Sequence, residues 1–137
     1  SYSINDAVRV FGSISSGFKT PSLFQLSLNA NLKAEKSVNY EAGVSYQKKQ
    51  LSSRLVYFNR KINNGIDYNY ITFNYFNYVK QIVNGLEWEM NARLGKKAGI
   101  TANYTLLLSE ELTQNRLTTK DTVTYDYLLR RPKHHFN

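Results

Sequence analysis

Apolar and polar residues alternate over long stretches of this chain, most clearly between Leu86 and Ser109. Every second residue is apolar from Leu86 to Leu94 and again from Ala98 to Leu108, and only Gly95-Lys96-Lys97 separates the two runs. A period of two is typical of half-buried β-strands, and two such runs joined by a short turn predict a β-hairpin. Each strand is about twice the usual length of roughly five or six residues.

The same alternation continues along most of the chain and predicts an all-β protein. No helical period of useful length interrupts it. In the third strand we assign Leu51 and Leu55 to the apolar side, because the alternate positions carry Arg54 and Arg60. The expected strands lie at 7–18, 37–47, 51–62, 81–94 and 98–110, and a sixth begins near Lys133.

The connections between these strands alternate between long and short. Short turns lie at 48–50 and 95–97, whereas the other connections are much longer. In an antiparallel up-and-down sheet, all short turns then fall at one end, as in outer-membrane barrels. Tilted strands of about nine to eleven residues also span a membrane. The pattern therefore predicts a transmembrane β-barrel, although a soluble sandwich would also present one polar face.

Five to six strands are too few to close such a barrel. The smallest membrane barrels have about eight strands, and an open edge in lipid leaves backbone groups unpaired. We therefore expect either a piece of a larger barrel or a chain that needs partner chains.

Composition keeps two other classes of protein open. The 137 residues carry a net charge of +8 and are 14% aromatic, which fits a membrane surface but also a nucleic-acid-binding protein. The alternatives are a soluble β-sheet module for single-stranded nucleic acid and a cell-surface adhesin-type β-sandwich. The chain has no cysteine, which excludes disulfides and thiolate metal sites within it.

The tyrosine-rich stretch from Ile66 to Val79 is the best candidate for a binding surface, because aromatic rings offer large contact areas at low entropic cost. In the alternative interpretation, the third and fourth strands extend beyond the membrane and their aromatic residues pair across strands. The tip turn then lies near Thr72 to Tyr75. The candidate ligand-binding tyrosines are Tyr68, Tyr70, Tyr75 and Tyr78.

Two arginines, Arg130 and Arg131, are the remaining candidate ligand-binding residues, because guanidinium groups clamp anions. More often, such residues pair with carboxylates of the barrel interior or of a plug, or with lipopolysaccharide phosphates. His134 and His135 are adjacent, so on a strand they point to opposite faces and do not chelate together. No catalytic grouping stands out, and we expect no enzyme activity, no metal and no cofactor.

Two segments carry a family resemblance. The first segment resembles a pattern of TonB-dependent outer-membrane receptors. It contains Gly17-Phe18-Lys19-Thr20-Pro21, the stretch from Asn31 to Ser37, and Tyr40-Glu41-Ala42-Gly43, with Ala34 where the family has proline. Gly85-Leu86-Glu87 matches a Gly-x-Glu at the start of a strand in that family. The segment LLRRPKHHFN resembles a stretch in members similar to vitamin B12 receptors.

The resemblance implies that residues 1–137 are part of a 22-stranded barrel in the outer membrane of a Gram-negative bacterium, without the plug domain. Such receptors bind a scarce nutrient, cobalamin-like or an iron-siderophore, and import it with energy from the TonB–ExbB–ExbD complex. The implied partners are the remainder of the barrel, the plug, outer-membrane lipid and lipopolysaccharide, and a small-molecule cargo, with no nucleic acid.

Overall fold

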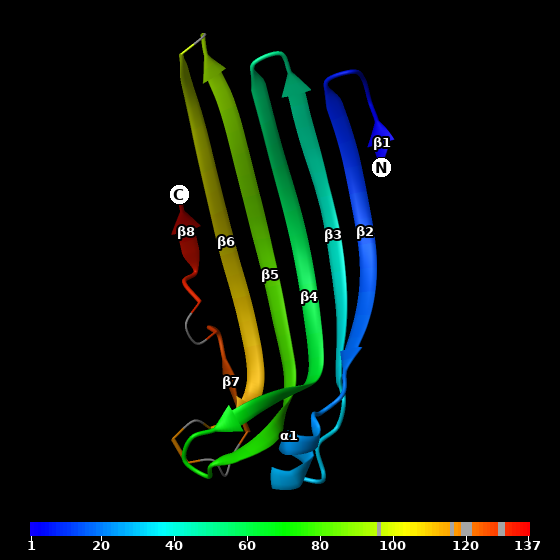
Figure 1. Ribbon diagram of the computed structural model, residues 1–137, viewed down its shortest axis with the longest axis vertical. Helices are drawn as coiled ribbons and strands as arrows, with labels where there is room; N and C mark the ends of the chain where they lie inside the picture. Colours follow the sequence, from blue (N-terminus) through cyan, green and yellow to red (C-terminus); the bar gives the residue numbers. More distant parts are fainter. Residues whose placement is uncertain (96, 116, 119–121, 129–130) are drawn as a thin grey trace.

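The alternating stretches form one long, curved antiparallel sheet in the computed structural model (Figure 1). The structure describes residues 1–95, 97–115, 117–118, 122–128 and 131–137. Neighbouring strands follow the order of the sequence from β1 to β7, and β8 pairs with β6 beside β7. The elements are β1 (Tyr2–Ser3), β2 (Val8–Lys19), α1 (Leu23–Leu28), β3 (Glu35–Lys48), β4 (Leu51–Asn69), β5 (Asn74–Leu94), β6 (Ala98–Gln114), β7 (Thr122–Tyr125) and β8 (His134–Phe136).

The five predicted strands are confirmed as β2 to β6, but the third and fourth are longer than expected. Strand β4 continues to Asn69, and β5 begins at Asn74, so this hairpin extends well beyond its neighbours. The short strands β1 and β7 were not predicted. The short helix α1 in the first long connection was not predicted either, because its six residues show no helical period.

The short turns between β3 and β4 and between β5 and β6 lie at one end of the sheet, as predicted (Figure 1). The predicted long connection between the third and fourth strands is instead an extension of β4 and β5, which a turn at 70–73 joins at the other end. In the turn between β3 and β4, Lys49 has φ 46°, and Gly95 after β5 has φ 71°. These left-handed residues reverse the chain within two or three residues. Helix α1 and the tip of the β4–β5 hairpin lie together at the opposite end, at the bottom of Figure 1.

The strand register places the apolar residues of neighbouring strands side by side. Tyr57 pairs with Ala42 on one side and with Leu86 on the other, and Leu86 pairs in turn with Leu106. Cross-strand partners share one face of a sheet, whereas successive residues alternate between faces. We name this side the apolar face; it carries Val8, Val10, Ile14, Tyr40, Val44, Leu51, Leu55, Tyr57, Leu86, Trp88, Met90, Ile100, Tyr104, Leu106 and Leu108.

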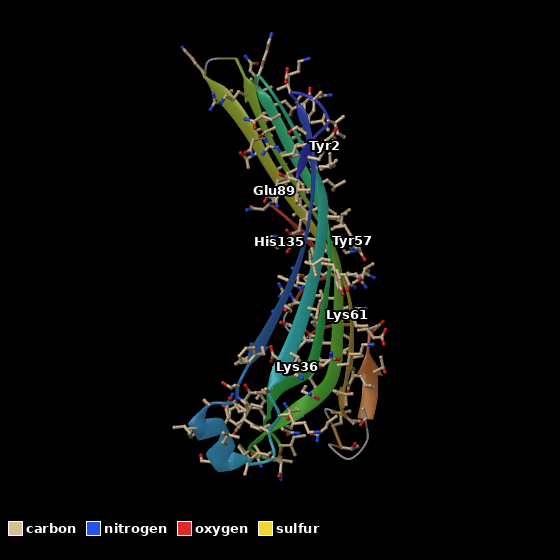
Figure 2. The ribbon with its side chains drawn as sticks, turned by 90° about the vertical axis from the view of Figure 1, so that its right-hand side faces the viewer. Tyr2, Lys36, Tyr57, Lys61, Glu89 and His135 are labelled. Atoms are coloured by element: carbon tan, nitrogen blue, oxygen red, sulfur yellow. The ribbon has the colours of Figure 1, made fainter. Side chains whose placement is uncertain are left out.

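The opposite side, named the polar face, carries most of the charged residues of the strands. Figure 2 shows Tyr57 and Lys61 on one side of the ribbon and Glu89 and His135 on the other. The assignment of Leu51, Ser53, Leu55 and Tyr57 to the apolar side is therefore confirmed. Members of the polar face are Arg9, Ser13, Glu41, Ser45, Arg54, Arg60, Glu87, Glu89, Asn91, Thr101, Asn103 and Thr105.

The apolar face is exposed in the chain. The side chains of Val44, Leu55 and Tyr57 are 38%, 39% and 49% exposed, although they lie at the centre of the sheet. Among the described residues, no large side chain is less than 2% exposed, so the sheet has no conventional interior. An exposed apolar surface of this extent marks an interaction with lipid or protein. Among the same residues, no helix is long and apolar enough to cross a bilayer.

On β4 and β5, hydrogen-bonded polar side chains interrupt the apolar face. The Tyr57 hydroxyl donates to Oδ1 of Asn84 at 3.1 Å, and the Asn59 amide donates to the same oxygen. Beyond these side chains, towards the helix end, the same side of the sheet carries Lys36, Lys61 and Lys80. Tyrosines with an apolar body and a hydrogen-bonded hydroxyl are typical of membrane–water interfaces.

Candidate functional site

Tyrosine rings gather where the β4–β5 hairpin projects beyond the other strands. Tyr68 and Tyr75 are cross-strand partners, and their ring centroids lie 5.0 Å apart at 62°. Tyr70 lies edge-on to Tyr68, with centroids 5.1 Å apart at 84°. The predicted cross-strand pairing of these aromatics is therefore confirmed.

The hairpin tip is built by residues 70–73, slightly before the predicted turn at Thr72 to Tyr75. Oδ1 of Asn69 accepts from the backbone N–H groups of Ile71, at 2.8 Å, and Thr72, at 3.1 Å. Such bonds from an asparagine to the residues after it stabilise turns. Phe73 has φ 51°, and its side chain is 71% exposed.

Helix α1 adds an aromatic ring from a distant part of the sequence. The Ser22 hydroxyl accepts from the Gln25 N–H, while Oε1 of Gln25 accepts from the Ser22 N–H, which forms a capping box. Phe24 in this helix lies edge-on to Tyr75, with centroids 6.3 Å apart at 83°. No pattern in the sequence pointed to Phe24 as a member of this cluster. We name Phe24, Tyr68, Tyr70, Phe73 and Tyr75 the aromatic loop surface.

Side-chain amides fix the helix-bearing connection to the hairpin. The Asn29 amide donates to the Tyr75 carbonyl at 2.9 Å. Asn77 accepts from the Lys33 N–H at 2.8 Å and donates to the Lys33 carbonyl at 3.0 Å and the Asn64 carbonyl at 2.7 Å. Leu32, between these anchors, is buried. The aromatic loop surface is therefore assembled from two connections held together by hydrogen bonds.

Tyr78 lies beneath this surface rather than on it. Its ring covers Gly65, its cross-strand partner, and only 9% of the residue is exposed. Burial raises the pKa of the Tyr78 phenol above its ordinary value, and the charges of Glu35, Glu111 and Asp67 raise it further. Tyr78 thus stays neutral at physiological pH and packs the base of the projecting hairpin.

The two candidate arginines lie in the segment between β7 and β8. Arg131 is exposed, and its backbone N–H donates to the Leu128 carbonyl at 3.4 Å. Its charge acts on Tyr78, whose pKa it lowers in part. Arg130 lies outside the described residues. Within the described residues, no cation–π contact joins Arg131 to a ring of the aromatic loop surface.

The polar face holds a hollow of about 120 Å³. The Asn39 amide donates to Oε1 of Glu41 at 2.7 Å, whereas Oδ1 of Asn39 is buried without a hydrogen-bond partner among the described residues. A buried amide oxygen without a donor is uncommon. The hollow is lined by Asn39, Glu41, Arg54, Val56, Phe58, Arg60 and Glu87.

Neither histidine forms part of a cluster suited to a metal ion within the described ranges. His134 pairs with Leu106 of the apolar face, and His135 pairs with Thr105 of the polar face. The prediction that the two side chains point to opposite faces is confirmed.

A protein-family comparison decides the class of protein. The family described as TonB dependent receptor-like, beta-barrel, matches residues 1–137. The chain belongs to this family. Its sheet is a part of the receptor barrel, located in the outer membrane of a Gram-negative bacterium, so the apolar face is the side that meets lipid.

A solved structure agrees with this assignment. The siderophore receptor PirA from Pseudomonas aeruginosa is 27% identical in sequence and superposes with a TM-score of 0.73. The match covers 80% of this chain and 24% of the PirA chain. The receptor barrel predicted from strand length, loop alternation and resemblance is therefore confirmed as the fold class, and the sheet here is not closed.

Proposed function

We propose that this part of the barrel carries cargo-binding residues of a receptor that imports an iron-loaded siderophore. The observation that carries the proposal is the aromatic loop surface, at the end of the sheet where the long connections lie. In outer-membrane barrels the long loops face the outside of the cell, where a nutrient arrives. The likeness to a siderophore receptor supports iron-siderophore rather than cobalamin as cargo.

The exposed rings offer an apolar and polarisable surface. Tyr70 and Phe73 are 72% and 71% exposed. The Phe24 ring packs edge-on against the Tyr75 ring, and the Asn29 amide donates a hydrogen bond to the Tyr75 backbone carbonyl. Rings fixed by neighbours lose little entropy on binding, which favours affinity. We assign cargo contact to Tyr68, Tyr70 and Tyr75, and a supporting role to Tyr78. Arg130 and Arg131 would attract anionic groups of the cargo.

We further propose that the polar face receives the plug domain and that import draws energy from the TonB–ExbB–ExbD complex. The charged side chains of this face and the unpaired Oδ1 of Asn39 support a polar partner. A donor from the plug would satisfy that oxygen, because buried acceptors are normally paired.

Cargo class is tested by uptake into a bacterial strain whose own receptor gene has been deleted and replaced by the full-length receptor. Cells are offered radiolabelled iron on a panel of siderophores, or labelled cyanocobalamin, with and without functional TonB. We expect TonB-dependent uptake of iron from at least one siderophore and no uptake of cobalamin. Cobalamin uptake, or iron uptake that persists without TonB, contradicts the proposal.

The binding residues are tested in the same strain with Tyr70→Ala and Tyr75→Ala. Each substitution removes a ring from the aromatic loop surface and should weaken siderophore binding about tenfold. The matched control is Tyr2→Ala, because Tyr2 is 71% exposed but lies in β1, beside Val10 and away from the loops. Equal affinities of all three variants and the unchanged receptor would remove these tyrosines from the site.

A further inference from the structure

One side-chain amide, that of Asn77, joins three segments at the helix end of the sheet. Asn77 lies in β5 opposite Ile66, and it is half-buried. Its Oδ1 accepts from the Lys33 N–H at 2.8 Å, and its Nδ2 donates to the Lys33 carbonyl at 3.0 Å. A primary amide offers both an acceptor and donors, so it pairs with the backbone of Lys33 much as a neighbouring strand would.

The same amide also compensates for a break in the β4–β5 ladder. The ladder pairs Asn63 and Gly65 with residues of β5 but skips Asn64, which has φ 54°. A half-buried carbonyl that leaves the ladder needs another donor. Nδ2 of Asn77 supplies it, at 2.7 Å from the Asn64 carbonyl. One side chain therefore fixes both the bend of the hairpin and the position of Lys33.

Helix α1 depends on such anchors because it has little packing of its own. None of its six residues, all of which the structure describes, is buried. Phe24 meets the hairpin edge-on, with its ring centroid 6.3 Å from that of Tyr75. The remaining links are the Asn29 amide, which donates to the Tyr75 carbonyl at 2.9 Å, and Asn77. The helix lies beside the bent ends of β4 and β5 at the bottom of Figure 1.

We propose that Asn77 is a positioning residue of the cargo site. It docks the connection that carries α1 against the bent hairpin, so that Phe24 and the tyrosines form one preformed surface. A siderophore that touches rings of both connections binds only the docked arrangement, and its apparent affinity falls with the docked fraction. Asn77 acts through these rings, because the oxygen and the nitrogen of its amide are engaged within the chain. The effect on binding rests on the proposed function, whereas the docking does not.

Docking is measured without cargo, in the purified full-length receptor after replacement of any cysteine outside residues 1–137. Spin labels are placed at Leu23, which is 86% exposed, and at Lys48, and their distance is read by pulsed electron paramagnetic resonance. The labels lie at opposite ends of the sheet, which the 14 residues of β3 span in about 45 Å at roughly 3.3 Å per residue (Figure 1). We expect a narrow distance distribution in the unchanged receptor and a broad one in Asn77→Ala.

The matched control is Asn74→Ala in the same strand. Among the described residues, the Asn74 side chain bonds only to the N–H of Tyr75, the next residue, and not to the first connection. The label distance should therefore stay narrow in this variant. Asn29→Ala, which removes the other amide anchor, should broaden the distance as Asn77→Ala does.

Asn77→Asp separates the hydrogen bonds of the side chain from its volume. A carboxylate still accepts from the Lys33 N–H but donates to neither carbonyl, so the distance should be broad at pH 7. The protonated carboxyl group donates again, and the distance should narrow towards about pH 4, where an ordinary aspartate is half protonated. Asn77→Ala should stay broad at both pH values. This comparison controls for the titration of Glu35, which accepts from the Ile66 N–H beside Asn77.

Binding of a radiolabelled ferric siderophore from the uptake panel is then measured for the same variants. We expect Asn77→Ala to weaken it about tenfold, which corresponds to a docked fraction of about one tenth, and Asn74→Ala to leave it unchanged. The proposal is overturned by an unchanged label distance in Asn77→Ala, by equal broadening in Asn74→Ala, or by a distance in Asn77→Asp that stays broad in acid.

The cargo assignment is judged separately, with Tyr70→Ala and Tyr75→Ala. If these variants weaken siderophore binding while Asn77→Ala does not, Asn77 does not position the site, and the proposal falls. If none of the three weakens binding, the assignment of cargo to the aromatic loop surface fails instead. The label distances alone then decide whether Asn77 docks the first connection.

Discussion

Leu106→Arg is expected to destabilise the membrane-inserted receptor by about 2–4 kcal/mol, whereas Thr105→Arg should change its stability by less than about 1 kcal/mol. The two residues are neighbours on β6, but Leu106 pairs with Leu86 on the apolar face and Thr105 pairs with Glu87 on the polar face. An arginine at 106 must enter lipid, while an arginine at 105 meets a carboxylate in the barrel interior.

The measurement is urea unfolding of the full-length receptor folded into phospholipid vesicles, followed by tryptophan fluorescence. In vivo, Leu106→Arg should give little assembled receptor, whereas Thr105→Arg should give a normal amount. Equal destabilisation by both substitutions would mean that the two faces of the sheet do not differ in environment, which contradicts the lipid-facing assignment.

Gly85→Ala is expected to cost about 1–3 kcal/mol of stability, which is the usual penalty for overpacking. Gly85 lies opposite Phe58, whose ring covers it so closely that a Cβ atom would collide with the ring. The matched control is Gly99→Ala. Gly99 lies in β6 on the polar face, as Gly85 does in β5, and the nearest atom to an added Cβ is the Ala92 carbonyl oxygen at 3.4 Å. Alanine there should be neutral or slightly stabilising, because glycine weakens strands.

A double-mutant cycle separates this collision from a general effect of the added methyl group. In a Phe58→Ala background the ring is absent, so Gly85→Ala should cost nearly nothing. The readout is the same urea unfolding in vesicles. If Gly85→Ala costs as much without the Phe58 ring as with it, the ring contact is not the cause.

The same packing recurs at two further positions, which makes it a general feature of this sheet. The Phe11 ring covers Gly43, and the Tyr78 ring covers Gly65, each across a strand pair. Arg54 also lies over the Phe11 ring, with its guanidinium carbon 5.0 Å from the ring centroid. Aromatic rings over cross-strand glycines fill the space that a side chain would occupy, and so support the register.

The alternation of residues was sufficient to predict the membrane-spanning parts of the sheet. From Leu86 to Leu94 and from Ala98 to Leu108 every second residue is apolar, which predicted the pairing of β5 with β6. The faces of β4 are less clear in the sequence, and the charges of Arg54 and Arg60 decided their assignment. The extension of β4 beyond Ile62 was not predictable from the pattern, because Asn63, Asn64 and Gly65 break it. Asn64 has φ 54°, and the ladder continues with Gly65 opposite Tyr78.

The missed elements are short or depend on distant contacts. Six residues of α1 are too few to create a helical period, and the local signal was the capping box formed by Ser22 and Gln25. Strand β7 has only four residues. The tyrosines of the loop surface were predictable from composition, but Phe24 and Asn77 were not, because their contacts join the two connections across long sequence separations.

Site-directed spin labelling along 51–58 tests most directly that this sheet is the wall of a membrane barrel. Residues 1–137 contain no cysteine. Single cysteines are therefore introduced at 51–58 and labelled in the full-length receptor in vesicles, after replacement of any cysteine outside residues 1–137. Labels at Leu55 and Tyr57 should collide with oxygen dissolved in lipid, labels at Ser52 and Arg54 should not, and a label at Tyr70 should collide with a water-soluble nickel chelate. Equal access of the nickel chelate to Leu55 and Tyr70 would contradict a lipid-facing sheet.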